Sequence, residues 1–455
     1  MTISGLNRKT FYPEERLFQF LFHGFIGLLF FLGFGMPAWA AVPIEQWTTS
    51  NGAKVLFVET HAIPILDISV EFDAGARRDT PEKSGLAALT NASLDKGIVG
   101  DNGRMKNEAS ILDTFADTGA LRSNSVSMDR AGYTLRVMAG QDESERAIDL
   151  MAGLLGSPAF PAELLERDKA RLVATIREEA TRPETLATRR FKRDIYGSHP
   201  YGASPTPASV NSVTRDDLLA FHRTHYVANR AVISIVGDID TAKAKEIADR
   251  ISRKLPVSRE TLPLLPEIKP TVGQIERISH PATQAHVLLG MPAVKRGDPD
   301  FFALTVGNYI LGGGGFSSRL MQEVREKRGL TYGVSSQFSP MLQEGPFIIG
   351  LQTEKKQADQ ALKVVRSTLD DFLQSGPTSA ELQSAKDHLI NGFAMQMDNN
   401  RKVLELIAMI GYYRLPVDYL DTWTENIRRV STEEVKAAFQ RKLSAEKMVT
   451  VVVGG

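Results

Sequence analysis

Two distant stretches of this chain match each other in residue pattern. Residues 213–221 read Val-Thr-Arg-Asp-Asp-Leu-Leu-Ala-Phe and residues 431–439 read Ser-Thr-Glu-Glu-Val-Lys-Ala-Ala-Phe, at an offset of 439 − 221 = 218. Further matches at or near this offset pair 162–164 with 380–382, 68–72 with 286–290 and 231–237 with 448–454. Because similarity at one fixed offset marks repeated structure, we predict two homologous domains.

A proline-rich segment separates the two copies. Residues 262–270 read Leu-Pro-Leu-Leu-Pro-Glu-Ile-Lys-Pro, with three prolines in nine residues. Proline locks φ and extends the chain, so this segment is predicted to be a stiff linker outside both sheets. We therefore expect an N-terminal domain at 42–258, a linker at 259–274 and a C-terminal domain at 275–455.

Within the first copy, strand and helix patterns alternate. Runs rich in β-branched and aromatic residues predict strands at 55–58 and 66–72 and a hairpin at 122–138, and helical patterns lie at 83–95, 107–118, 143–155 and 161–179. Hairpin strands followed by grouped helices are typical of an α+β fold. We expect two homologous α/β sandwiches, each a mostly antiparallel sheet with helices packed on it.

The first forty residues are predicted to be an export signal. A basic segment precedes an apolar run of 19 residues at 17–35, and residues 38–40 read Ala-Trp-Ala, a small-x-small cleavage sequence. We expect cleavage after Ala40, a mature chain of 455 − 40 = 415 residues and a periplasmic location. The alternative is an uncleaved membrane anchor facing the periplasm, because a run of this length can cross a bilayer.

Charge and cysteine content exclude several classes of function. Lysine plus arginine equals aspartate plus glutamate, 54 against 54, so charge favours neither nucleic acid nor an anionic membrane as a partner. The absence of cysteine excludes disulfides, thiolate metal sites and a cysteine nucleophile. We expect no nucleic-acid partner and no membrane contact beyond an uncleaved leader.

The repeat, the order of elements and the sequence Tyr-Gly-Ser-His-Pro-Tyr at 196–201 resemble the insulinase and mitochondrial processing peptidase superfamily of zinc metallopeptidases. The resemblance covers essentially the whole mature chain. It implies that the two sandwiches form half of a clam-shell chamber that holds a peptide.

The zinc motif of that family is missing from this chain. In catalytic members the first long helix carries His-x-x-Glu-His, where the histidines bind zinc and the glutamate polarises the attacking water. Residues 84–92 read Ser-Gly-Leu-Ala-Ala-Leu-Thr-Asn-Ala, so Ala88 and Ala92 replace the histidines and Asn91 replaces the glutamate. Alanine has no lone pair to offer and asparagine is no base near neutral pH, so we expect no metal or other cofactor in this chain.

Other residues are weak candidates for a rebuilt zinc site. The family's third ligand is a glutamate on a later helix, where Glu178 and Glu179 lie in this chain. His222 and His225 are close in sequence, but they follow the end of a helical pattern, and we interpret them as partly exposed structural residues. His199 matches a family position that we interpret as packing and turn structure.

The second half retains the family's arginine–tyrosine motif, Arg-Gly-Leu-Thr-Tyr at 328–332. Gly329 suits the position after a helix end, where φ becomes positive, so the side chains of Arg328 and Tyr332 are expected to converge. In the family this pair binds the substrate backbone near the scissile bond, and guanidinium and phenol groups suit a carbonyl or an oxyanion. The alternative is that Arg328 caps a helix and Tyr332 fills a core.

Four successive glycines precede that motif: Gly312, Gly313, Gly314 and Gly315. The stretch lacks the Gly-Lys-Ser/Thr ending of a P-loop, and the pattern before it, at 304–311, is helical where a Rossmann turn needs a strand. We therefore expect a flexible loop at the mouth of the chamber.

Some members of the family are heterodimers in which one chain carries the zinc motif and the other carries no working one. By this resemblance the chain is the second kind: a non-catalytic subunit of an exported zinc metallopeptidase, inert alone, with zinc in a homologous partner. It would hold an unstructured peptide by strand addition and through Arg328 and Tyr332. The alternatives are a peptidase-derived peptide-binding or scaffold protein without proteolysis and a structural subunit of a membrane complex.

Overall fold

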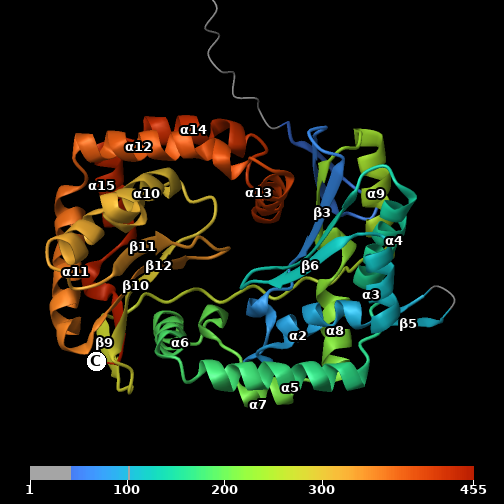
Figure 1. The fold of residues 1–455 in the computed structure, drawn as a ribbon, viewed down its shortest axis with the longest axis horizontal. Coiled ribbons are helices and arrows are strands. Elements are labelled where there is room, and N and C mark those ends of the chain that lie inside the picture. The colour runs from blue at the N-terminus through green and yellow to red at the C-terminus, as the bar shows by residue number, and fades with distance from the viewer. Residues whose placement is uncertain (1–42, 101–102, 455) are drawn as a thin grey trace, which may run out of the picture. The chain divides into compact units, whose positions relative to one another are not determined.

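Each copy of the repeat builds one β-sheet (Figure 1). The computed structural model describes residues 43–100 and 103–454, so the predicted export signal lies outside the described residues. The first sheet contains β1 (Glu45–Thr48), β2 (Lys54–Glu59), β3 (Ile65–Phe72), β6 (Leu121–Val126), β7 (Ala131–Met138) and β8 (Val232–Gly237). The second contains β9 (Gln274–Ile278), β10 (Gln284–Val294), β11 (Gly333–Phe338), β12 (Gly345–Glu354) and β13 (Val449–Val453). A separate hairpin pairs β4 (Gly97–Val99) with β5 (Met105–Asn107).

Apart from the extra edge strand β1 of the first sheet, the strand order is the same in both sheets. It is β1-β2-β8-β3-β7-β6 in the first and, read in the matching direction, β9-β13-β10-β12-β11 in the second. The pairs β2–β8 and β9–β13 are parallel, and the other neighbours are antiparallel. The predicted fold class, two homologous and mostly antiparallel α/β sandwiches, is therefore confirmed.

Helices precede, separate and follow the strands in both halves, although the two sets are not identical. The first half has α2 (Leu86–Ala92), α3 (Glu108–Asp117), α4 (Asp142–Gly156), α5 (Ala162–Glu179), α6 (Pro183–Tyr196), α7 (Pro207–Asn211), α8 (Arg215–His225) and α9 (Thr241–Lys254). The second half has α10 (Phe301–Asn308), α11 (Ala358–Ser375), α12 (Ser379–Phe393), α13 (Asn400–Tyr413), α14 (Tyr419–Arg429) and α15 (Thr432–Lys442). Among the described residues, no helix combines the length and the apolar character that crossing a bilayer requires.

The two helices that begin at the matching stretches 213–221 and 431–439, α8 and α15, have the same N-terminal cap. The side chain of Thr214 accepts the main-chain N–H of Asp217 at the start of α8 in a reciprocal capping box. Ser431 and Glu434 form the same box at the start of α15. A capping box satisfies two N–H groups that a helix start leaves without partners, so the pattern recurs because the backbone requires it.

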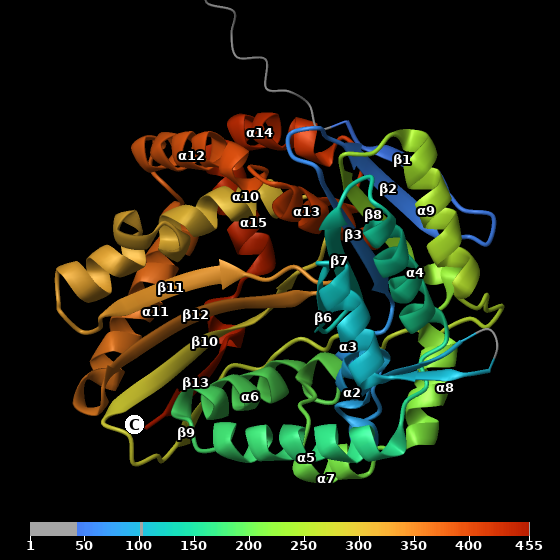
Figure 2. The ribbon, with the colours of Figure 1, turned by 45° about the vertical axis from the view of Figure 1, so that its right-hand side comes forward.

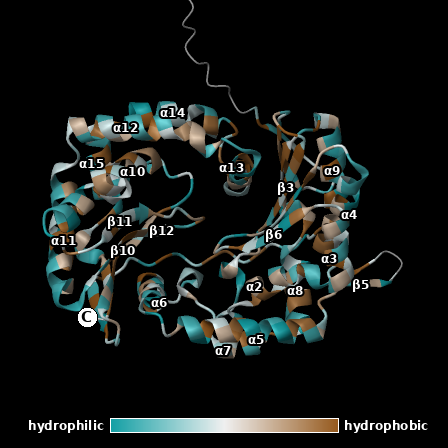
Figure 3. Ribbon diagram, viewed as in Figure 1, coloured by the Kyte–Doolittle hydropathy of each residue, from teal (hydrophilic) through white to brown (hydrophobic). Residues whose placement is uncertain are grey.

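Each sheet buries its outer face under helices of its own half. Ile68, Val70 and Leu135 lie in the core of the first half, and Val287 and Leu289 lie in that of the second. The strands accordingly carry much of the hydrophobic colouring in Figure 3. Burial of these apolar side chains is the main stabilising contribution in both halves.

The inner face of each sheet is covered by one helix from the other half (Figures 1 and 2). From the first half, α6 packs Phe191 and Ile195 against Val449 and Val451 of β13. From the second half, α13 contacts β2, β3 and β8 of the first sheet, and a Cβ on Gly411 would lie 2.5 Å from the Leu56 side chain. The two helices are equivalent in the repeat, at an offset of 400 − 183 = 217. This exchange of helices was not predicted from the sequence.

The exchange ties the two halves together. Residues 43–455 form one compact unit, although residues 256–273 between the halves contain no helix or strand. The linker predicted at 262–270 lies in that irregular stretch. The exact domain boundaries stay a prediction.

Candidate functional site

The helix at the lost zinc motif, α2, begins under tight local control. Gly85 precedes it with φ = +107°, and Asp79 accepts the main-chain N–H groups of Gly85 and Ala87 at 2.8 Å each. Burial raises the pKa of Asp79 to about 6. The helix spans Leu86–Ala92, which is shorter than the predicted 83–95 because 3-10 turns replace α-helix on both sides.

Asn91, where the family's glutamate base would stand, holds the surrounding elements together. The residue is 2% exposed. Its Nδ2 donates to the carbonyl of Gly132 on β7 and to the hydroxyl of Tyr226 after α8, both at 3.3 Å. Its own carbonyl accepts from Asn124 Nδ2 of β6 at 2.9 Å. Asn91 thus has a structural role at the place where catalytic relatives carry a base.

Ala88 is half-buried and Ala92 is exposed, and neither methyl group can coordinate a metal. The described part of the chain holds no cluster of three or more metal-ligating side chains. The residues present on α2 therefore do not fit the zinc that the fold family implies. The expectation that this chain carries no metal stays a prediction.

The glutamates considered as a third ligand are engaged in ion pairs. Glu178 pairs with Arg182 at 2.5 Å, and Glu179 pairs with Arg189 at 3.2 Å. The first contact is exposed and the second is partly buried, and surface pairs of this kind contribute little to stability. They also hold the carboxylates at the junction of α5 and α6.

His222 and His225 are buried, which corrects the expectation of partly exposed, cationic side chains. Nε2 of His222 lies 2.8 Å from the carbonyl of Leu155, and Nδ1 of His225 lies 2.9 Å from the carbonyl of Asp73. Because a carbonyl only accepts, each of these ring nitrogens carries the proton. Burial lowers the pKa of both rings to about 4, so both are neutral at pH 7.

The Tyr-Gly-Ser-His-Pro-Tyr sequence joins the first half to the second. Nδ1 of His199 accepts the main-chain N–H of Tyr201 at 3.1 Å, in agreement with the predicted turn role. Nε2 of His199 lies 2.7 Å from Oε1 of Gln343, and the hydroxyl of Tyr196 donates to the carbonyl of Glu344 at 3.1 Å. The turn was predictable, but its contacts with residues more than a hundred positions away were not.

Asp129 is a site residue that the sequence analysis missed. It lies in the β6–β7 turn and is 1% exposed. Its carboxylate accepts from the hydroxyls of Tyr201 at 2.6 Å and Tyr413 at 2.9 Å, and from the N–H of Leu342 at 2.8 Å. Arg77 lies 3.3 Å away as its counter-ion. An aspartate in a turn pattern predicts an exposed residue, so its burial has no local signal.

The arginine–tyrosine motif has the predicted backbone but not the predicted convergence. Gly329 has φ = +60°, as expected after a helix end. Arg328 Nη1 donates to the carbonyl and to Oε2 of Glu323, at 2.7 Å each, as in the capping alternative. Tyr332 is 85% exposed and fills no core. The two side chains line different cavities, Arg328 beside α11 and Tyr332 beside α6.

Arg325 binds the backbone of the exposed Tyr332. Its Nη1 donates to the carbonyl of Tyr332 at 2.9 Å, and its guanidinium lies 4.6 Å from the ring centroid of Phe316. Phe316 is itself 64% exposed. One arginine thus contacts two exposed aromatic residues, and this arrangement could not be predicted from residue spacing alone.

The glycine stretch is more regular than expected. Tyr309–Gly313 forms π-helical turns that continue α10, and a 3-10 turn follows at Gly315–Ser317. A Cβ on Gly312 would lie 2.5 Å from Oγ of Ser336 on β11, so only glycine fits. The expectation of a loop is therefore wrong for Gly312 and Gly313. The expected mobility stays a prediction.

A polar strip of the first sheet's inner face stays open beside α13. Asp67 on β3 and Arg136 on β7 form a two-pronged ion pair at 2.7 and 2.9 Å. Glu71, further along β3, is buried next to Arg130, and burial raises its pKa. These residues line a cavity of about 400 Å³, with Arg401 on its α13 side.

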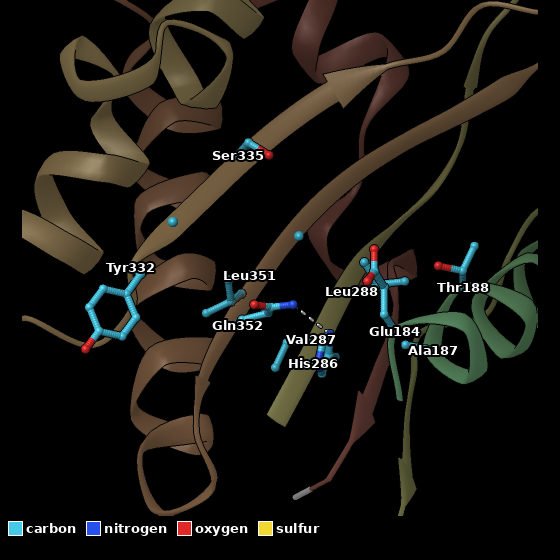
Figure 4. A pocket seen from close by; sticks show the side chains of 12 residues that line it. Glu184, Ala187, Thr188, His286, Val287, Leu288, Tyr332, Ser335, Leu351 and Gln352 are labelled. Carbon is cyan, nitrogen blue, oxygen red and sulfur yellow. Dashed lines mark hydrogen bonds between the residues drawn. The ribbon is translucent and has the colours of Figure 1, made fainter. Parts of the chain in front are cut away.

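The second sheet carries the equivalent strip beside α6 (Figure 4). His286 on β10 and Gln352 on β12 lie 3.2 Å apart. His286 also pairs with Val453 of β13 as Asp67 pairs with Val236 of β8, so the two residues occupy the places of the first strip's ion pair. This register shifts the match predicted between 68–72 and 286–290 by one residue. Tyr332 stands on one side of this cavity of about 330 Å³, and Glu184 and Thr188 of α6 stand on the other. Both cavities adjoin a sheet edge, β6 or β11, that pairs on one side only within the described residues.

Known proteins are similar to this chain in sequence, in fold or in both. A family model described as the peptidase M16 inactive domain matches residues 212–389. A crystal structure of a peptidase M16 inactive domain from Pseudomonas fluorescens is 36% identical with a TM-score of 0.86, over 90% of this chain and 97% of that one. The non-peptidase homolog YmxG of Helicobacter pylori is 25% identical over 415 residues, 89% of this chain and 92% of that protein. The periplasmic protease PqqL from Escherichia coli has the same fold, with a TM-score of 0.77 at 16% identity, over 90% of this chain and 45% of its own.

Proposed function

The chain belongs to the M16 peptidase family as a homologue of its inactive members, and we propose that it is the non-catalytic subunit of an exported, heterodimeric zinc peptidase. In this proposal zinc and the catalytic glutamate lie in a homologous partner. This chain supplies a surface that holds the peptide. Ala88, Asn91 and Ala92 support the division, because they can supply neither a ligand nor a base.

The observation that carries the proposal is the exposure of Tyr332. Its side chain is 85% exposed, and its hydroxyl has no hydrogen-bond partner among the described residues. Gly329 and Arg325 nevertheless fix the backbone on which it stands. A phenol that is free of partners and stands on a fixed backbone is suited to donate to a peptide carbonyl or to an oxyanion in a docked partner's site.

Arg328 is paired in this structure but can be released. Its contact with Glu323 is at the surface, since the arginine side chain is 41% exposed, and such pairs are worth about 0–1 kcal/mol. Lys327 also binds Glu323, at 2.5 Å, so the carboxylate keeps a partner if Arg328 turns away. Both cations lower the pKa of Glu323, Lys327 the more strongly. We propose that a bound peptide recruits Arg328.

The sheet edges provide the second element of peptide binding. The strand β6 has one neighbour in its sheet, β7, and lies against α2 through the bond from Asn124 to Asn91. An extended peptide can add to such an edge by main-chain hydrogen bonds. The peptide would then pass beside the helix at which catalytic relatives bind zinc.

A peptide-binding protein without a proteolytic partner is the second candidate. It is favoured by the separation of Arg328 and Tyr332 into different cavities, since an oxyanion site needs its donors together.

Reconstitution with the partner tests the first proposal against the second. Pull-down from the native host is expected to recover a relative with an intact His-x-x-Glu-His motif, and the pair is expected to cleave unstructured peptides. In that pair Tyr332→Phe should lower kcat/KM by about a hundredfold without changing Tm. Tyr419→Phe, on α14, is the control and should leave kcat/KM unchanged. Recovery of no zinc-motif relative would favour the second candidate.

The export step has its own test. Sequencing of the mature N-terminus from the periplasmic fraction is expected to begin at Ala41. A protein that retains residues 1–40 in the membrane fraction would favour the anchored alternative.

A further inference from the structure

A second inner cavity of the second half contains one charged side chain, Lys192. This cavity of about 470 Å³ lies between α6 and the strands β10, β11 and β12. Most of its wall is apolar and includes Phe191, Leu288 and Ile348. Ser335 and Gln337 of β11 add neutral hydrogen-bonding groups. The chemistry of the cavity is thus that of an apolar pocket with a single ammonium group.

Lys192 is half-buried and has no hydrogen-bond or ion-pair partner within the described residues. Some other half-buried or buried lysines do have one: Lys83 pairs with Asp217 at 2.7 Å, and Lys169 pairs with Glu166 at 2.8 Å. Lys54 and Lys436 are half-buried without a partner among the described residues, but neither lines the cavity at Lys192. Burial alone lowers the pKa of Lys192, because the ammonium loses water and gains no counter-charge. An ammonium group that loses water without gaining a partner costs stability, so a ligand that supplies the counter-charge would be stabilised there.

We propose that this cavity binds a carboxylate group of an extended peptide, with Lys192 as the ion-pair partner. The inference rests on the proposed function in that the ligand is a peptide. It adds which chemical group of that peptide is recognised, and where. The carboxylate is either the peptide's C-terminus or an aspartate or glutamate side chain.

The position of β11 explains why the ligand is a peptide and not a small acid alone. The cavity at Lys192 and the cavity at Tyr332 share Thr188, Leu288 and Ser335, so they adjoin. Both follow β11, whose outer side has no neighbouring strand in the described structure. A peptide added along β11 would run from the exposed phenol of Tyr332 toward Lys192, with alternate side chains over the apolar wall.

The repeat provides an internal contrast. The position on α13 that is equivalent to Lys192 is 192 + 217 = 409, which is Met409. The first half therefore has no counterpart of this ammonium group on its covering helix. Carboxylate recognition of this form belongs to the second half alone.

Four labelled peptides with one apolar sequence test the proposal on purified residues 41–455 without a partner. They differ in a free or amidated C-terminus and in glutamate or glutamine at one internal position. Fluorescence anisotropy is expected to show about tenfold tighter binding for peptides with a carboxylate than for the amidated glutamine peptide. The free-acid arm and the glutamate arm identify which carboxylate is bound.

Variants test whether the ammonium group of Lys192 causes the preference for peptides with a carboxylate. Lys192→Met keeps the length of the side chain, removes the charge and should abolish the preference, whereas Lys192→Arg should retain part of it. The control is Arg193→Met, which removes a charge from the next, exposed residue of α6 and should change nothing. Circular dichroism of each variant checks that it is folded.

Three results would overturn the inference: equal affinity for all four peptides, an unchanged preference in Lys192→Met, or no binding of any peptide. None of these depends on a catalytic subunit. A missing partner would instead count against the heterodimer and leave the Lys192 result readable.

Discussion

The open strips of the two sheets occupy equivalent places but differ in chemistry. In the first strip Asp67 and Arg136 form an ion pair at 2.7 Å, and in the second His286 and Gln352 share one hydrogen bond at 3.2 Å. The strand pairings around them are the same. The frame of the repeat is therefore set by main-chain pairing and by the apolar outer faces, while the residues that face open space are free to differ.

The two halves agree, by contrast, at the turn that leads from a helix into the edge strand. Gly119 precedes β6 and Gly329 precedes β11, and both have φ = +60°. A left-handed backbone turn favours glycine whatever the neighbouring side chains are. Where the backbone sets the requirement, the two halves keep the same residue.

The largest expected difference between the halves is in their response to acid. His222 and His225 have folded pKa values of about 4, below the ordinary value of 6.5. Below pH 6.5 the unfolded chain takes up protons that the folded chain does not, so their stabilising contribution is full above that pH and is lost as the pH falls toward 4. The loss is about 3 kcal/mol for each histidine between pH 7 and pH 4.

Urea titrations at both pH values measure this loss. The mature chain has two tryptophans, Trp47 and Trp423, whose fluorescence reports unfolding. His222→Gln should remove about 3 kcal/mol of the pH dependence of unfolding. An unchanged slope would mean that the imidazole of His222 is already protonated in the folded state.

The ion pair of the first strip should be worth more than its counterpart. Asp67 is 5% exposed in its side chain, so Asp67→Ala leaves Arg136 without a counter-ion and should cost about 3 kcal/mol of unfolding free energy. His286→Ala breaks one neutral contact and should cost about 1 kcal/mol or less. The double variant Asp67→His with Arg136→Gln copies the second strip and should recover most of the loss. Equal losses of unfolding free energy for Asp67→Ala and His286→Ala in urea denaturation would show that the two strips do not differ in stability.

Restoring ligands tests whether α2 lost zinc only through its side chains. Ala88→His with Ala92→His places two imidazoles one turn apart on one helical face, as the family's motif does. Zinc at a hundred times its Kd should then raise the unfolding free energy by about 2.7 kcal/mol. The unchanged protein should show no such rise and no stoichiometric zinc by plasma mass spectrometry. The matched variant in the second half is Ser384→His, which makes a histidine pair of the same spacing with His388 on α12. Stoichiometric zinc in the unchanged protein would refute the non-catalytic assignment.

The smallest expected effect concerns the shared glycines. Gly329→Ala and Gly119→Ala meet no atom within 4 Å, so only the positive φ opposes them, at about 1 kcal/mol each. Gly333→Ala, also in open space but in extended backbone, should change stability by less than half of that. Thermal unfolding compares the three, and a cost at Gly329 alone would show that the two turns are not equivalent.

Elements that depend on local pattern could be predicted from the sequence. The strand predicted at 66–72 is β3 at Ile65–Phe72, and the helix predicted at 161–179 is α5 at Ala162–Glu179, because side-chain periodicity reports directly which face is buried. The helix predicted at 83–95 is shorter because the positive φ of Gly85 delays its start and a 3-10 turn at Leu94–Lys96 replaces its last residues.

Contacts that depend on distant partners could not be predicted. The carbonyls that bind His222 and His225 lie 67 and 152 positions away along the chain. The apolar stripe of α6 indicates that one side is buried but does not indicate which sheet buries it. At the candidate site, Gly329 could be predicted because one residue determines its turn. The separate directions of Arg328 and Tyr332 depend on Glu323 and Arg325, and no spacing rule describes those contacts.

The exchanged helices also determine the order in which a growing chain can be completed. The last strand of the first sheet ends at Gly237, but its covering helix ends at Tyr413, 413 − 237 = 176 residues later. The second sheet's covering helix, by contrast, is synthesised before any strand of that sheet. A chain delivered from its N-terminus therefore holds a finished sheet with one bare face until nearly all of it has emerged. Cutting the chain between the halves would leave each fragment carrying the other's cover, so the two pieces would be recovered folded together or not at all.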